Sequence, residues 1–316
     1  MPRLLRACLL LILGLGADSA GAVNHARDQW TVDAAQRLAT RGEAKSLATA
    51  AVLLLSANAV GAKEGVRALD LAERAALAAP DDHPIGWIHL RVCEQTPGCD
   101  LPGVATTLRW TDADNAAPWM PMLAAAIRDK DDQAMEHALT GMAEGKRFYL
   151  YRNPTVTMLF DAVKAGGIAA PPGLTNADRA RLDASVSFSA RIIPPLRAVA
   201  EACKDVQTRP RRHEACVRIA ALLQRSDTVA AQAEGYAVQK RLFPPDAREV
   251  RTAVERLKNL ESRMRAERRF ETAFLPWFNN RLALHRLALM RQFAREEDVM
   301  NAILREHHIY GDLSHD

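Results

Sequence analysis

Segments with helical periodicity, separated by short breaks, occupy almost the whole chain from residue 31 onward and constrain its fold more than any other feature. Apolar side chains recur in them at three- and four-residue spacing, whereas the period-two alternation of β-strands is absent. Alanine, leucine and arginine, which are strong helix formers, are abundant. Because the breaks are short, neighbouring helices are expected to be antiparallel. The sequence therefore predicts an all-α protein built from antiparallel helix pairs.

Each predicted helix is about three turns or more in length. Asp131 and Asp132 mark a good helix start, because acidic residues favour the positive end of the helix dipole. Thr175 or Asn176 is expected to begin a helix that the proline pair 194–195 kinks or ends. Besides the helix that begins at Thr175 or Asn176, the predicted helices cover residues 31–40, 44–58, 64–79, 84–93, 101–111, 116–128, 131–144, 154–165, 196–205, 211–225, 228–242, 246–269, 280–294 and 296–308.

A cluster of glycine and proline between Gly166 and Gly173 is the clearest linker. The charge changes sign near it: residues 175–316 hold 25 basic and 19 acidic residues, a net +6, whereas the preceding part of the mature chain is acidic. We therefore predict a boundary near residue 170, with a helical repeat domain over 23–170 and a C-terminal helical domain over 171–316. The basic residues of the second half are interleaved with acidic ones, as on solvated helix faces, so no nucleic-acid partner is expected.

The first twenty-two residues have the layout of a secretory signal peptide. Arg3 and Arg6 precede an apolar run over Leu9–Leu15, and a small-x-small site ends at Ala22. Cleavage there would start the mature chain at Val23, in the periplasm or outside the cell, and would remove the cysteine at position 8. No second apolar run is long enough to span a membrane.

Four cysteines remain in the mature chain, as two close pairs. An oxidising compartment favours disulfides, for which three connectivities are possible. The local pairing is favoured because Cys93 and Cys99 bracket a Pro-Gly turn. Cys203 and Cys216 flank a second turn-like stretch and are nearly equidistant from its centre, near position 209 or 210. A zinc site and free thiols are the alternatives.

Residues 49–82 form a unit in which small residues and a proline occur at a characteristic spacing. Ala68, Ala75 and Pro80 fall at the spacing A-x6-A-x4-P, and Trp87 begins a W-x2-L pair on the next helix. This unit resembles a tetratricopeptide repeat, in which small residues let paired helices approach closely and large residues fill the space between pairs. Trp87 is expected to be such a filler or, if exposed, a ligand contact. One departure is Ala72, which stands where the family has a large apolar residue; Leu71 takes over part of that role.

A second, weaker unit covers residues 116–145, with Trp119 on its first helix and Met135 where the family has alanine. The resemblance thus spans 49–145 and implies a tetratricopeptide-like solenoid that binds a protein or peptide partner in a groove. An aromatic cluster follows this unit; it is expected either to pack against the next helix or to form a groove wall. The residues predicted to contact a partner are Trp87, Trp119, Tyr149, Tyr151 and Arg152.

No motif for catalysis, metal binding or cofactor binding is complete in this sequence. His213-Glu214 begins like the zinc motif H-E-x-x-H, but Val217 occupies the position of the second histidine. G-x-S-x-G, P-loop and G-x-G-x-x-G motifs are absent. We therefore assign no catalytic, metal or cofactor residues and expect an exported helical-repeat binding or scaffold protein of the cell envelope. The alternative is a secreted enzyme of unrecognised family, with a cleft between the two helical halves.

Overall fold

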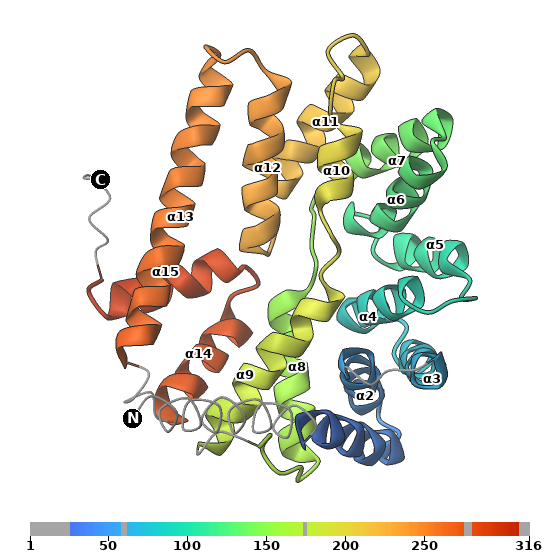
Figure 1. Ribbon diagram of the computed structural model, residues 1–316, viewed down its shortest axis with the longest axis vertical. Helices are drawn as coiled ribbons and strands as arrows, with labels where there is room; N and C mark the ends of the chain where they lie inside the picture. Colours follow the sequence, from blue (N-terminus) through green and yellow to red (C-terminus); the bar gives the residue numbers. More distant parts are fainter. Residues whose placement is uncertain (1–25, 58–61, 173–175, 275–279, 310–316) are drawn as a thin grey trace, which may run out of the picture.

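The structure, a computed structural model, describes residues 26–57, 62–172, 176–274 and 280–309 (Figure 1). Within these residues it is all-helical and contains no β-strand, as the sequence predicts. A helix over residues 26–41 precedes the labelled ones. These are α2 (Ala44–Ser56), α3 (Ala62–Ala78), α4 (His83–Glu94), α5 (Leu101–Thr111), α6 (Met120–Asp129), α7 (Asp132–Glu144), α8 (Arg152–Ala165), α9 (Ala177–Ser189), α10 (Arg197–Ala202), α11 (Pro210–Leu223), α12 (Val229–Leu242), α13 (Arg248–Phe274), α14 (Asn280–Gln292) and α15 (Glu296–Glu306).

The helices are arranged as a stack that turns back on itself (Figure 1). Helices α2 to α7 pack one after another along one side, and α8 and α9 run through the middle. The chain then returns: α10 packs on α6, α11 packs on α7, and α12 and α13 extend the row. Finally α14 packs against both α8 and α9. The central pair α8–α9 is therefore covered by α2 from the first part of the chain and by α14 from the last.

Polar residues immediately before the helices explain where several of them begin. Asp82, Asp100 and Asp131 each accept a hydrogen bond from a backbone N–H in the first turn of the following helix. Asn176 caps α9 in the same way, and Thr228 caps α12. Such caps satisfy N–H groups that lack an intrahelical partner. The helix starts predicted at Asp131 and at Asn176 are confirmed.

One apolar core runs through most of the molecule. Its buried members extend from Ala34 in the first helix to Leu242 at the end of α12 without a division at residue 170. A smaller cluster joins α8 and α9 to α13, α14 and α15. The glycine–proline stretch at 166–173 therefore does not separate two cores, because α8 and α9 pack against each other across it.

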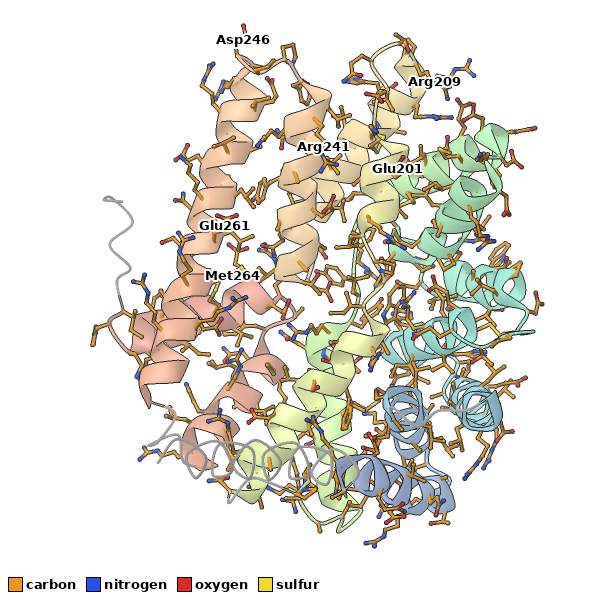
Figure 2. The ribbon with its side chains drawn as sticks, in the orientation of Figure 1. Glu201, Arg209, Arg241, Asp246, Glu261 and Met264 are labelled. Atoms are coloured by element: carbon orange, nitrogen blue, oxygen red, sulfur yellow. A yellow bond between two sulfur atoms is a disulfide. The ribbon has the colours of Figure 1, made fainter. Side chains whose placement is uncertain are left out.

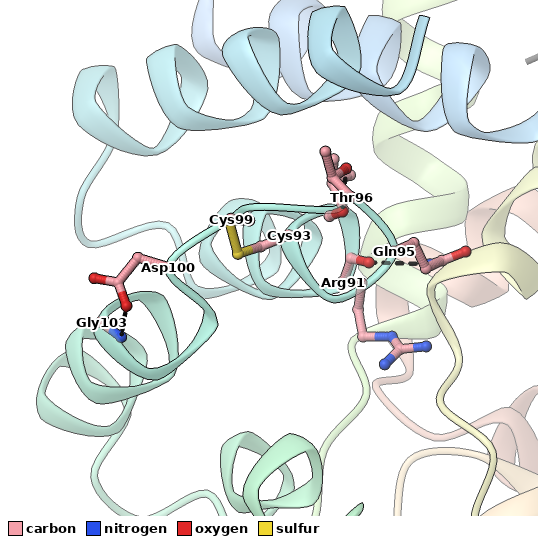
Figure 3. Close-up of a disulfide and its surroundings, with 8 residues drawn as sticks. Arg91, Cys93, Gln95, Thr96, Cys99, Asp100 and Gly103 are labelled. Carbon is pink, nitrogen blue, oxygen red and sulfur yellow. Dashed lines mark hydrogen bonds between the residues drawn. A yellow bond between two sulfur atoms is a disulfide. The ribbon is translucent and has the colours of Figure 1, made fainter. Parts of the chain in front are cut away.

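Both disulfides link neighbouring helices, in the pairing that the sequence favours. Cys93 at the end of α4 is bonded to Cys99, which precedes α5, with their Cα atoms 5.4 Å apart (Figure 3). Cys203 and Cys216 join α10 to α11 with a Cα–Cα distance of 5.6 Å. Arg209, at the turn between these two helices (Figure 2), reaches Asp132 on α7. Among the described helices, even α13 with its 27 residues lacks the apolar run that a bilayer crossing requires.

Helices α11 and α12 approach each other closely at Gly235. A Cβ atom at this position would lie 2.7 Å from the backbone nitrogen of Gln224 and 2.8 Å from the carbonyl oxygen of Ala220. Because backbone atoms cannot move aside as a side chain does, we expect Gly235→Ala to lower the free energy of unfolding by about 1–3 kcal/mol. Urea denaturation measures this. Lys240→Ala, on the exposed side of the same helix, is the control and should change stability by less than about 0.5 kcal/mol. Equal stability of the two variants would contradict the close approach.

Candidate binding groove

Trp87 lies in the core and does not contact solvent. Its side chain is 0% exposed, and its indole N–H donates a 3.2 Å hydrogen bond to the backbone oxygen of Ile192. Arg91, one turn later on α4, donates to the same oxygen at 3.1 Å. Trp87 thus fills space between helices, one of the two roles predicted for it. Its predicted contact with a partner is wrong, because a residue without exposed surface has none to offer.

The segment between α7 and α8 is fixed by a buried carboxylate and a buried amide. The Tyr151 hydroxyl donates a 2.5 Å hydrogen bond to Asp112, and the Arg147 guanidinium also binds this carboxylate. Asn115 donates to the backbone oxygen of Tyr149 at 3.0 Å and accepts from its backbone N–H at 2.9 Å. Burial, followed by the hydrogen bond to Asp112, raises the pKa of Tyr151 well above its ordinary value. Tyr151 is buried, so it too has almost no surface with which to contact a partner, contrary to the prediction.

Asp227 joins the second half of the chain to the same segment. Its buried carboxylate accepts a 2.8 Å hydrogen bond from the backbone N–H of Leu150, and desolvation by burial raises its pKa to about 6. Arg152, at the start of α8, forms an ion pair with Glu296 of α15. Perturbed carboxylates are typical of catalytic clefts. Here, however, the hydrogen bonds and ion pairs hold the start of α8 against the last helices. Among the described residues, these groups therefore serve to pack the two parts of the chain together.

Trp119 and Tyr149, the remaining predicted contacts, keep part of their surface exposed but already have partners within the chain. The Arg109 guanidinium lies 4.2 Å from the Trp119 ring, and His137 packs edge-on against it at 5.4 Å. Tyr149 packs against Tyr151 with ring centroids 6.3 Å apart. The aromatic cluster after residue 145 thus packs between helices, one of the two roles predicted for it.

A groove with a volume of about 620 Å³ lies elsewhere, on the outer side of the first helix pairs. Residues of α3 and α5 line its two sides, and residues of α4 line its floor. In the ribbon, α4 lies between α3 and α5 and packs against both (Figure 1). This volume lies within the range of pockets that bind ligands. The groove is lined by Leu69, Glu73, Ala76, Leu77, Ala79, Pro80, Gly86, His89, Gly98, Cys99, Asp100, Gly103, Val104, Thr107, Leu108 and Thr111.

Local sequence explains why the groove is open. A Cβ atom at Gly86 would lie 2.9 Å from the side chain of Leu108. The glycine therefore lets α5 pack closely against α4, and no side chain at position 86 fills the floor of the groove. Pro80 lies in the turn that ends α3, and Asp100 starts α5 by accepting the backbone N–H of Gly103 at 3.1 Å (Figure 3). The Cys93–Cys99 disulfide ties the end of the floor helix to the start of the α5 wall.

Two exposed large apolar residues lie on the helices that form this groove. Three large apolar residues stand out as exposed among the described residues, namely Leu77 at 75%, Trp110 at 82% and Leu284 at 37%. Leu77 lines the groove. Trp110 is about 60° round α5 from the lining residue Thr107, which places it at the rim. Leu77 lies at the end of α3, just before α4. The backbone oxygen of Thr111, next to Trp110, is 3.0 Å from the ring nitrogen of His83 at the start of α4, so both residues lie toward the same end of the groove. Clustered exposed apolar side chains are typical of interaction sites.

The charges at the groove are negative. Glu73 and Asp100 line it, and the lining contains no lysine or arginine. Burial lowers the pKa of His89 at the floor, an effect that the charge of Glu73 partly offsets, so the imidazole is neutral at neutral pH. Among the described side chains, none forms an ion pair with Glu73. The groove therefore carries uncompensated negative charge beside apolar surface.

None of the predicted contact residues lines this groove, although one feature of the sequence indicates it. The buried positions of α3 are Ala68, Leu71, Ala72 and Ala75, which form one stripe. Leu77 lies outside this stripe, where a solvated helix would carry a polar residue.

Comparisons of the chain with protein-family models, with curated proteins and with solved structures found no match.

Proposed function

We propose that this chain is an exported helical-repeat binding protein of the cell envelope, and that the groove between α3 and α5 holds a segment of a partner polypeptide. The observation that carries the proposal is the pairing of a 620 Å³ groove with the exposed side chains of Leu77 and Trp110 at one end of it. Fully burying a leucine or a similar side chain gains about 1.5–3 kcal/mol. Tryptophan is among the residues that dominate binding energy at interfaces.

Export to the periplasm or beyond is part of the proposal. Two disulfides are present, and disulfides persist in oxidising compartments. The signal peptide expected over residues 1–22 lies outside the described residues. Its cleavage near Ala22 would release a mature chain starting at Val23.

We also propose that the helix pairs from α2 to α7 are tetratricopeptide-like. In support, Ala68 and Ala75 are completely buried where α3 packs, as small residues are at close helix contacts in such repeats. Pro80 follows the end of α3 at the expected offset. In this arrangement the groove lies between the second helices of two successive pairs.

A photoreactive residue tests where the partner binds. With p-benzoylphenylalanine at position 77, irradiation of the envelope fraction should cross-link a discrete polypeptide to the chain. The same residue at position 284 on α14, where a leucine is also exposed, is the matched control and should give no such product.

The energetic test uses charge at the same two positions. We expect Leu77→Asp to reduce recovery of the cross-linked polypeptide in pull-downs at least about tenfold, because a carboxylate replaces an apolar contact. Leu284→Asp should leave recovery unchanged. Equal recovery with both variants, measured after circular dichroism has shown that both are folded, would rule out the groove as the binding site.

A further inference from the structure

We propose that the partner segment carries a basic side chain next to an apolar one, and that Glu73 is the carboxylate that receives it. This inference rests on the proposed function of the groove and adds the chemistry of its occupant. The inference depends on the position of the Glu73 carboxylate, which forms no ion pair with any described side chain and lies on the same helix face as the exposed apolar residue Leu77.

The negative charge of the groove is not balanced from within. The nearest basic residue on α3 is Arg74, which forms an ion pair with Asp70 at 3.4 Å. The imidazole of His89 lies at the floor, and its pKa is lowered by burial. The remaining lining residues are apolar or neutral apart from Glu73 and Asp100. A basic side chain of the partner would therefore be attracted by these carboxylates and would not be repelled by a lysine or arginine of the groove.

The two carboxylates are not equivalent. Asp100 caps α5, where its charge lies against the positive end of the helix and its oxygen accepts the N–H of Gly103. Glu73 lies within α3, away from the N-terminus, and is exposed. The Glu73 charge is therefore not stabilised by a helix N-terminus. Glu73 is therefore the group that gains most from a basic partner.

The position of Glu73 relative to Leu77 fixes the spacing expected in the partner. The two residues are four positions apart on α3, about one helical turn or roughly 6 Å along its axis. An extended segment covers that distance in about two residues. The partner should therefore carry lysine or arginine two positions from the apolar residue that covers Leu77, or four positions from it if it binds as a helix.

The same charges disfavour anionic occupants. A phosphate of a lipid headgroup or of a nucleic acid in the groove would face Glu73 and Asp100, and like charges repel. A polypeptide with a basic residue matches both the apolar surface and the negative charge, so it is the occupant that this groove favours.

Selection of peptides tests the inference directly. A phage-displayed library of random decapeptides is selected on the mature chain and on Glu73→Lys. Glu255→Lys serves as the matched control, because Glu255 is another exposed glutamate within a helix, α13. Peptides recovered on the unmodified chain should be enriched in lysine and arginine over aspartate and glutamate by about fivefold relative to the library. On Glu73→Lys the preference should reverse, and on Glu255→Lys it should persist.

Affinities of the recovered peptides complete the test. By fluorescence anisotropy, replacing the basic residue of a selected peptide with glutamate should weaken its binding to the unmodified chain about five- to tenfold. The loss should be smaller at high salt, because the pair is exposed. For Glu73→Lys the glutamate peptide should be the tighter binder.

The outcomes separate this inference from the proposed function. If Leu77→Asp abolishes binding of the selected peptides but the charge preference is the same on Glu73→Lys, the charge inference fails and the groove function stands. If the selected peptides bind Leu77→Asp as well as the unmodified chain, or if no peptide is recovered, both fail. Leu77-dependent sedimentation with phosphatidylglycerol vesicles, but not with phosphatidylcholine vesicles, would overturn the inference in favour of an anionic lipid.

Discussion

Trp87→Ala is expected to lower the free energy of unfolding by about 3–5 kcal/mol. The side chain is among the largest that are fully buried, and surrounding helices cannot collapse completely into the space that it would leave. The substitution also removes the donor of the hydrogen bond to Ile192, which lies 105 residues further along the chain. Guanidinium denaturation followed by circular dichroism measures the loss.

Trp110→Ala is the matched control for this prediction. The same side chain is removed, but from a position that is 82% exposed, so stability should change by less than about 0.5 kcal/mol. The two tryptophans should thus differ about sixfold or more in their effect on stability. Similar losses for both would mean that Trp87 does not fill the core as described.

Asp112→Ala is expected to lower the free energy of unfolding by about 2–4 kcal/mol at neutral pH. The carboxylate is completely buried and accepts hydrogen bonds from Arg147, Tyr151 and Asn115. Removing it leaves the Tyr151 hydroxyl and the Asn115 amide without this acceptor inside the protein. Arg147 retains access to water, which keeps the expected loss below that of a fully buried ion pair.

Asp114→Ala tests whether this effect is specific. Asp114 lies two residues away and pairs with Lys146 at 3.0 Å, but both side chains are well exposed. Exposed ion pairs contribute about 0–1 kcal/mol, so this variant should remain close to the unmodified chain in its denaturation midpoint. A loss as large as that of Asp112→Ala would show that the segment is held by surface charge rather than by the buried carboxylate.

The helices were predictable because their signals are local. Apolar periodicity and capping residues act within a few positions, so the starts at Asp131 and Asn176 follow from neighbouring residues alone. The disulfide pairs were predictable for the same reason, since each links residues on either side of one turn. In both cases the sequence separation between interacting groups is short.

Burial and exposure were less predictable because they depend on distant segments. Tyr151 is an aromatic residue beside basic ones, which is typical of a binding surface, but Asp112 binds its hydroxyl from 39 residues away. The groove arises because α3 and α5 both pack on α4, a relation that no single segment encodes. The glycine–proline stretch predicts a domain boundary near residue 170, but composition cannot reveal that helices on either side of it share a core.

The central position of α8 and α9 has a consequence for folding during synthesis. Val156, Phe160 and Leu182 are covered by Ala283, Leu287 and other residues of the last helices, which are synthesised about a hundred positions later. Until those helices emerge, an apolar face of α8 and α9 stays open to solvent, and contacts across such sequence separations form slowly. Chains truncated before α14 should therefore aggregate, and a holding chaperone would act in the interval before α14 and α15 are synthesised.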